Sequence, residues 1–326
     1  MFYYGRLILQ YALTLLAALT INFLLPRLAP GSPINAILGP DVIEAMTPDE
    51  IQAVLADFGL DLPIWQQYWI YLSGVFQADF GTSVALAMPV WDALMGRLPW
   101  TLLLMGMALA VSTLLGVTLG VLSAWKRGEV ADVSIMGCVL FLGSLPPFWL
   151  AMLLVTLFST TLGWLPSFGA YKLGVATGSL DWWLGVGQRL IMPVTALALV
   201  QGASILLIAR SSMLMALEQD YITFTRARGL GEGRVFFRHA LRNALLPVYT
   251  NVMLGVGSLI GGALVIETVF SYPGLGSLVV MGVNSRDYNL LQGIFVFSTV
   301  GVIAANLLTD LFYPLIDPRT LEGAEG

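Results

Sequence analysis

Six apolar runs, each near the length that a lipid bilayer requires, constrain this chain more than any other feature of its sequence. About 20 apolar residues cross the hydrocarbon core as a helix, and 57% of the 326 residues are hydrophobic while only 11% are charged. Backbone groups cannot stay unpaired in lipid, and the runs lack the short alternation of barrel strands. We therefore expect an all-α integral membrane protein with about six transmembrane helices, at residues 7–25, 100–124, 133–162, 190–209, 245–266 and 291–315.

The distribution of Lys and Arg sets the expected orientation, because positively charged flanks stay in the cytoplasm. With the N-terminus inside, most of the 15 basic residues fall on one side, and both termini are cytoplasmic. Residues 30–99 then form an extracytoplasmic segment, and residues 211–247 form a cytoplasmic loop. The run at 7–25 is longer than the apolar core of a signal peptide, so we expect it to be retained. We treat residues 1–326 as a single transmembrane domain.

The extracytoplasmic segment contains two expected helices. Thr47 and Glu50 form a capping box with a proline between them, which predicts a helix from Pro48 to about Phe58 that stops at Gly59. A second helix begins near Pro63 and is rich in aromatic residues, as is typical of a membrane interface.

The residue types and motifs of the sequence exclude several enzyme classes. A zinc site needs three or four ligands, and the chain has one Cys and one His. Neither of its two lysines ends a Walker A loop, and no G-x-S-x-G elbow is present. We therefore expect no catalytic, metal or cofactor-binding residues in this chain, and no ATP hydrolysis by it.

Two acidic residues and two glycine pairs in or beside the spans need an explanation. For Asp310 the simpler expectation is an ion pair with an arginine at the same depth, Arg210 or Arg6, and the alternative is a proton relay. The roles of Asp310 and Glu267 stay open at this point. The small-residue pairs predict close helix contacts and consist of Gly116 with Gly120 and of Gly257 with Gly261.

The loop at 211–247 holds the densest cluster of cations in the chain. Residues 213–228 can form one helix, with Gly229 at its left-handed C-terminal position. A second helix can run from Gly231 to Leu245, with a basic stripe at four-residue spacing, Arg234, Arg238 and Arg242. Anchoring at anionic headgroups would explain the charges. It would not explain the glycine turn, which favours a docking surface for a cytoplasmic partner.

Several motifs, in order along nearly the whole chain, resemble a known family. Within the loop, Asp220-Tyr221-Ile222, Arg226-Ala227-Arg228-Gly229-Leu230 and the stretch from His239 to Pro247 resemble the EAA-type coupling loop of ABC importer permeases of the dipeptide/oligopeptide/nickel group. Bulky residues, Thr223, Phe224 and Thr225, stand where that family usually has a basic residue and small ones. Other stretches similar to that group's first permease subunit are Pro30–Pro33, Phe58–Tyr68, Asp79–Ser83, Lys126–Gly128, Glu267–Gly276, Arg286–Tyr288 and Asp317–Arg319.

The resemblance implies a type I ABC importer permease fold and a transport role without enzyme activity of its own. It implies partners: a homologous second permease, two cytoplasmic ABC ATPases that hold ATP and magnesium, and an extracytoplasmic solute-binding protein. The location it implies is a bacterial or archaeal cytoplasmic (inner) membrane. The residues expected to meet an ATPase are Tyr221, Phe224, Thr225, Arg226, Ala227, Arg228, Gly229 and Leu230, with the basic stripe in support.

Two other functions stay open. A secondary transporter or channel would work without ATPases and would need polar groups near the middle of several spans. A permease-like scaffold or receptor would bind the loaded solute-binding protein without transport. The sequence leaves undetermined the pore-lining residues, the ATPase subunit contacted, and the substrate, which the resemblance narrows to a dipeptide, oligopeptide, nickel complex, glutathione or oligosaccharide.

Overall fold

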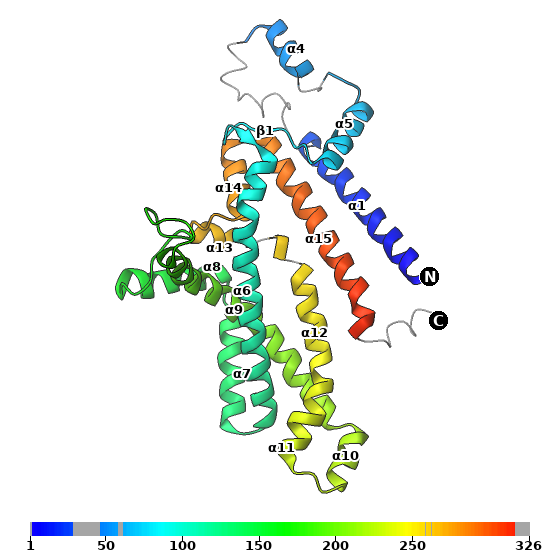
Figure 1. Ribbon diagram of the computed structural model, residues 1–326, viewed down its shortest axis with the longest axis vertical. Helices are drawn as coiled ribbons and strands as arrows, with labels where there is room; N and C mark the ends of the chain where they lie inside the picture. The colour runs from blue at the N-terminus through cyan, green and yellow to red at the C-terminus, as the bar shows by residue number, and fades with distance from the viewer. Residues whose placement is uncertain (1, 29–45, 58–60, 258, 262, 317–326) are drawn as a thin grey trace. The chain divides into compact units, whose positions relative to one another are not determined.

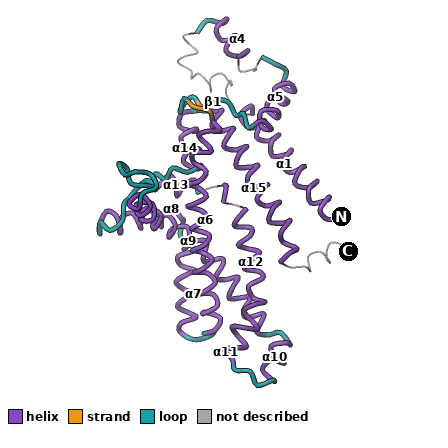
Figure 2. The backbone as a smooth tube through the Cα atoms, in the orientation of Figure 1, coloured by secondary structure: helices purple, strands orange, loops and turns teal. Residues whose placement is uncertain are grey.

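A computed structural model describes residues 2–28, 46–57, 61–257, 259–261 and 263–316. The described backbone consists mainly of helices joined by loops, with one two-stranded hairpin (Figure 2). It divides into two compact units, residues 1–101, 260–264 and 273–326 in the first and residues 102–259 and 265–272 in the second. The motifs at Pro30–Pro33 and Asp317–Arg319 and the helix stop at Gly59 lie outside the described residues.

The first unit is built on two long helices that lie side by side, α1 (Phe2–Leu28) and α15 (Tyr288–Ile316) (Figure 1). The hydroxyl of Tyr11 on α1 donates to Asp310 Oδ2 on α15 at 2.6 Å. The expected ion pair of Asp310 is therefore wrong: in the described part of the chain it bonds a tyrosine, not Arg6, and Arg210 pairs elsewhere. A tyrosine hydroxyl can satisfy a carboxylate at this depth without bringing a second charge into the bilayer.

The two helices expected within residues 30–99 form, the first as its capping signals predict. Helix α4 (Pro48–Asp57) begins after Thr47, whose N–H and hydroxyl both donate to Glu50 Oε2, at 2.7 and 2.9 Å. Helix α5 (Ile64–Gln77) follows Pro63, and its Leu72 is buried with Leu19 of α1 and Val296 of α15. The aromatic helix therefore packs against the spans of its own unit.

A small hairpin, β1 (Thr82–Ser83) paired antiparallel with β2 (Met88–Pro89), is held by a buried aspartate that precedes α15. Asp287 accepts from the Ser83 hydroxyl at 2.6 Å, from the Ala85 N–H at 2.9 Å and from the Leu290 N–H at 3.0 Å. Three donors satisfy a carboxylate that is removed from water. The hairpin is thereby fixed to the start of α15 and to α14 (Leu275–Ser285), which shares a core with it.

The second unit is a bundle around α9 (Leu180–Leu217), against which α7 (Val130–Gly143), α8 (Pro147–Leu154) and α12 (Leu241–Gly257) pack (Figure 1). Helix α6 (Val90–Trp125) begins in the first unit and continues into this one. The π-helix η1 (Val155–Thr161) extends α8. Two short helices follow α12 in the chain, the 3-10 helix η3 (Leu259–Gly261) and α13 (Leu264–Val269).

The expected spans are recovered in part. Four described helices, α1, α6, α9 and α15, are long and apolar enough to cross a membrane. The span expected at 133–162 is instead a pair of helices bent by 99°, because two consecutive prolines, Pro146 and Pro147, remove N–H donors and disfavour helical geometry before them. Counted as one span, this pair makes five. The one expected span left, 245–266, overlaps α12, which has 17 residues. The count of six, the cytoplasmic termini and the single-domain organisation stay predictions.

Glycines allow α6 and α9 to approach closely. A Cβ on Gly116 would lie 2.8 Å from Ile205, and one on Gly120 would lie 2.7 Å from the Leu206 carbonyl oxygen. Both distances are shorter than van der Waals contact, so no larger residue fits without moving a helix. This confirms the close contact predicted for the first glycine pair.

Candidate functional site: the coupling segment

The segment between α9 and α12, residues 218–240, begins with a joint that the sequence analysis missed. A single helix over 213–228 is wrong, because α9 ends at Leu217 and a separate helix, α10, spans Asp220–Ala227. Gln219 lies between them with extended backbone, φ −76° and ψ 148°, which interrupts the helical hydrogen bonds. The new N-terminus carries Asp220 in its first turn, where a carboxylate is favourable.

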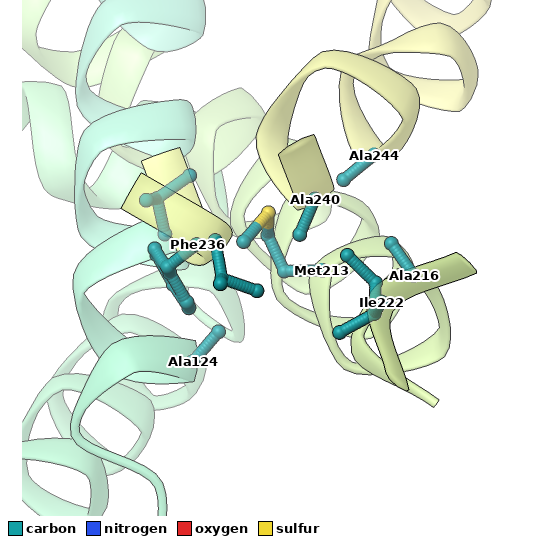
Figure 3. Packing of buried hydrophobic residues seen from close by; sticks show 9 residues of the cluster. Ala124, Met213, Ala216, Ile222, Phe236, Ala240 and Ala244 are labelled. Carbon is teal, nitrogen blue, oxygen red and sulfur yellow. The ribbon is translucent and has the colours of Figure 1, made fainter. Parts of the chain in front are cut away.

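Helix α10 is anchored by one fully buried side chain, Ile222. It belongs to a core cluster formed by the ends of α6 and α9 and by the chain that follows the glycine turn. Figure 3 shows Met213 of α9 at the centre of this cluster, between Phe236 on one side and Ile222 on the other. The cluster's buried residues are Val121, Ala124, Met213, Ala216, Ile222, Val235, Phe236, Ala240 and Ala244.

The size of this cluster makes the coupling segment a rigid extension of the bundle. Burying a large aliphatic side chain contributes roughly 1.5–3 kcal/mol, and Met213, Ile222 and Val235 are each 0% exposed. Trp125 of α6 adds a ring contact, edge-on to Phe236 with centroids 4.6 Å apart. Burial of Ile222, a residue quoted only as part of the Asp220-Tyr221-Ile222 motif, was not predicted from the sequence.

A polar contact ties α10 to α12. Asn243 Nδ2 donates to the Tyr221 hydroxyl at 2.9 Å. Tyr221, one of the expected docking residues, is therefore at the border between the anchored and the outward face of α10, and 36% of its surface is exposed.

The outward face of α10 carries the other expected docking residues. Phe224 is 71% exposed. Thr223, Ala227 and Arg228 are also exposed, while Thr225 is half-buried and donates to the carbonyl of its own helix at Tyr221. The three bulky residues at 223–225 thus enlarge an exposed surface and do not disturb the core.

The turn after α10 has the geometry that its glycine predicts. Gly229 has φ +77°, the left-handed region, and its N–H donates to the Arg226 carbonyl at 2.9 Å. Across the turn, Arg226 Nε and Nη2 donate to the two carboxylate oxygens of Glu232 at 3.0 and 3.2 Å. Leu230 packs inward against the core cluster. Arg226 and Leu230 therefore stabilise the turn, which leaves Phe224, Ala227, Arg228 and Gly229 as its free outer surface.

The helix expected over 231–245 forms, and it continues without interruption into α12. It begins as α11 (Glu232–Arg234), widens into a π-helix, η2 (Val235–Ala240), and becomes α12. The stripe residues Arg234, Arg238 and Arg242 are all exposed. Because hydrogen bonds in a π-helix run from residue i to i+5, four-residue spacing does not keep them in a straight line.

Next to the coupling segment, three helices meet at a charged cluster. Arg210 of α9 donates to both oxygens of Asp132 on α7, from Nε at 3.0 Å and from Nη2 at 2.9 Å. Ser123 of α6 donates to Asp132 Oδ1, and the Gly128 N–H donates to Oδ2 at 3.1 Å. Every acceptor position of this buried carboxylate has a donor, as a buried charge requires.

The family follows from comparison of this sequence with known proteins. A model of the family described as "Binding-protein-dependent transport system inner membrane component" matches residues 116–322, which include the whole coupling segment. A model of the N-terminal part of such membrane components matches residues 2–105. The chain belongs to this family. The EAA motif is a motif of this family. The chain is accordingly a permease of the ABC importer class and a multi-pass membrane protein.

Curated relatives of this permease match it over nearly their full lengths. The dipeptide transport system permease protein DppB of Alkalihalophilus pseudofirmus is 37% identical, over 97% of this chain and 98% of its own. The oligopeptide transport system permease protein AppB of Bacillus subtilis is 37% identical over 94% of each chain. DppB of Escherichia coli is 36% identical, also over 94% of each.

Among solved structures, the permease resembles a chain in the crystal structure of an amino acid ABC transporter with histidines. The TM-score is 0.50 at 15% sequence identity, and the match covers 68% of this permease and 92% of that chain. At this identity the similarity shows the fold alone.

Proposed function

We propose that this chain is one of two permease subunits of an ATP-driven importer that moves di- or oligopeptides, or a related small solute, across a bacterial or archaeal cytoplasmic membrane. The substrate class rests on the relatives named for dipeptide and oligopeptide transport. The partners are a homologous permease, two cytoplasmic ABC ATPases that bind ATP and magnesium, and an extracytoplasmic solute-binding protein. The chain itself binds no cofactor.

The observation that carries the coupling role is the contrast between the two faces of α10. Its inner face is fixed by Ile222 to the ends of α6 and α9, while its outer face presents Phe224 at 71% exposure. Aromatic and arginine side chains surrounded by a polar rim are typical anchors of protein interfaces. A helix fixed on one face and exposed on the other suits a cleft in an ATPase, with Phe224 and Arg228 as the inserted residues.

In this proposal, movement of the ATPases is carried to the spans through the core cluster. ATP-driven closure of the two ATPases pulls α10, and the buried contacts of Met213 and Phe236 pass the displacement to α9 and α12. The bundle then alternates between inward-open and outward-open states. Such coupling requires that the ATPase hold the two states with different free energies.

The test compares two glycines of the same turn in the complete complex, reconstituted in proteoliposomes. A Gly229→Trp substitution places a large side chain on the outer surface of the turn. It also forces a residue with a Cβ into a left-handed backbone conformation. We expect the complex to assemble in part but to lose solute-stimulated ATP hydrolysis and uptake. Gly231→Ala, at φ −64°, is the control that keeps both activities. Wild-type uptake by the Gly229→Trp complex would contradict the assignment.

Co-purification separates this proposal from its main alternative, a secondary transporter or channel that works without ATPases. An importer permease brings an ATPase and a sister permease with it, and uptake stops when ATP is withheld. A scaffold or receptor would bind the loaded binding protein without any uptake. Transport by the isolated chain, without ATP, would support the alternative.

A further inference from the structure

A pocket of about 340 Å³ that opens to the surface, called the cavity below, lies in the second unit between α6, α9 and α12. Three polar residues line it: Gln201 and Ser204 of α9 and Asn251 of α12. The rest of the lining is mainly Met, Leu and Ile. The volume falls within the range of small-molecule sites, roughly 300–1,000 Å³, and an apolar lining with a few polar groups is typical of such sites.

The two carboxamides lie near the middle of their helices, Gln201 in α9 and Asn251 in α12. Gln201 precedes Arg210 by nine residues, and Asn251 follows Arg242 by nine residues on the neighbouring helix. At 1.5 Å per residue, each is about 14 Å from its arginine, which is about half of a bilayer core. Polar groups at such depth are costly and mark solute pathways more often than other positions.

Neither carboxamide has a partner in the described part of the chain. The Ser204 hydroxyl donates to the backbone carbonyl of Gln201 at 2.9 Å, whereas no hydrogen bond is made by the side chain of Gln201 or of Asn251. Polar side chains between membrane helices commonly bond one another and hold the helices together. Within this chain these two do not, so adhesion between its own helices does not explain them.

We propose that this cavity is a binding site for the peptide backbone of the transported solute, with Gln201 and Asn251 as its hydrogen-bonding groups. A carboxamide offers a carbonyl acceptor and N–H donors, which match the N–H and C=O of a peptide bond whatever side chains the peptide carries. The apolar remainder of the lining accepts varied side chains without selecting among them. This inference rests on the proposed function, because it takes peptides as the solute.

Protection of an introduced cysteine tests the site without relying on transport. Ser204→Cys places a thiol in the lining, and Cys138→Ser removes the native, exposed one. The complete complex is labelled in proteoliposomes with a small water-soluble thiol reagent, in the presence of trialanine or of free alanine, which has no peptide bond. We expect labelling of the introduced thiol to slow with trialanine and to be unaffected by alanine.

Leucine variants then assign the protection to the carboxamides. A hydrogen bond to a neutral group contributes enough for a roughly three- to tenfold change in affinity, so Gln201→Leu or Asn251→Leu raises the trialanine concentration for half-protection by about that factor. Asn251→Gln, which keeps the carboxamide, restores part of the protection. The matched control is Gln188→Leu, the same change on α9 outside the lining, which leaves protection unchanged.

The outcomes separate this inference from the proposed function. A thiol that does not react, or that trialanine fails to protect while the same complex imports peptide, overturns the cavity assignment alone. The cavity assignment is also overturned if trialanine protects the thiol equally well in the leucine variants and in the protein that keeps Gln201 and Asn251. Absence of ATP-dependent peptide uptake by the wild-type complex overturns the proposed function instead, and the labelling result is read independently of it.

Discussion

Arg210 binds both carboxylate oxygens of Asp132, and in the described part of the chain this is the ion pair with the most deeply buried carboxylate: the Asp132 side chain is 7% exposed and that of Arg210 24%. The pair joins α9 to α7 one turn before Met213, the centre of the core cluster under α10. It therefore fixes the base of the coupling segment to a helix outside that segment.

Removing one member of this pair should destabilise the protein strongly. An Asp132→Asn substitution leaves the guanidinium without its counter-charge, at a cost of about 3 kcal/mol. We expect a clearly lower thermal unfolding midpoint for the purified permease. Arg127→Gln, which removes an exposed pair with Glu218 at 3.9 Å, is the control and should change stability by less than about 0.5 kcal/mol. Equal unfolding midpoints for the two variants would show that the buried pair contributes no more to stability than the exposed one.

The left-handed glycine of the coupling turn should be sensitive to the smallest substitution. A Gly229→Ala change forces a Cβ into the left-handed region, which costs roughly 1–2 kcal/mol, although nothing lies within 4 Å of that Cβ. The effect is backbone strain without a clash. Gly231→Ala, also in open space but at φ −64°, should have no such cost. Thermal unfolding of the two variants measures the difference, and a larger loss for Gly231→Ala would contradict it.

Close packing of α6 on α9 predicts a cost for adding one methyl group. In Gly120→Ala the new Cβ meets the Leu206 carbonyl oxygen at 2.7 Å and the Ala209 Cβ at 2.8 Å. Overpacking of this kind costs about 1–3 kcal/mol. Gly106→Ala on the same helix meets nothing within 4 Å and should be neutral or stabilising, because alanine favours helix by about 1 kcal/mol. Unfolding midpoints that fall equally for both would rule out the contact as the cause.

The capping box of α4 should make that helix sensitive to acid. Hydrogen bonds from the backbone and side chain of Thr47 hold the pKa of the Glu50 carboxyl below its ordinary value. The carboxylate therefore stabilises α4 above the ordinary pKa, and this contribution is lost as the pH falls through the lowered one. The protection factors of the α4 amides in hydrogen exchange, which correct for the pH dependence of intrinsic exchange, should fall on acidification. Thr47→Ala should lower them about fivefold at neutral pH, and Glu50→Gln should abolish their pH dependence.

Local signals in the sequence predicted much of this structure. The Thr47–Glu50 capping box, the left-handed Gly229 and the close approach at Gly116 and Gly120 are recovered because each depends on a few neighbouring residues or on side-chain size alone. The exposure of Phe224 agrees with its position opposite Ile222 on a short helix.

Features that depend on distant residues were not predicted. The partner of Asp310 is Tyr11, 299 residues away, and that of Arg210 is Asp132. The sequence holds other cations and hydroxyls that could have bonded Asp310, and other carboxylates that could have bonded Arg210. The joint at Gln219 was missed because no proline or glycine marks it, and burial of Ile222 decides where α10 begins. Gln201 was overlooked because one polar residue in a long apolar run gives no sign of facing a cavity.

Helix α9 runs without a break from Leu180 to Leu217. It contributes residues to the core cluster near one end and to the cavity lining near its middle. If an ATPase binds α10 and solute binds in the cavity, as proposed, thermodynamic reciprocity applies: each changes the binding affinity of the other by the same factor. A complex loaded with peptide should therefore hold its ATPases with a different affinity from an empty one, even when no ATP is present.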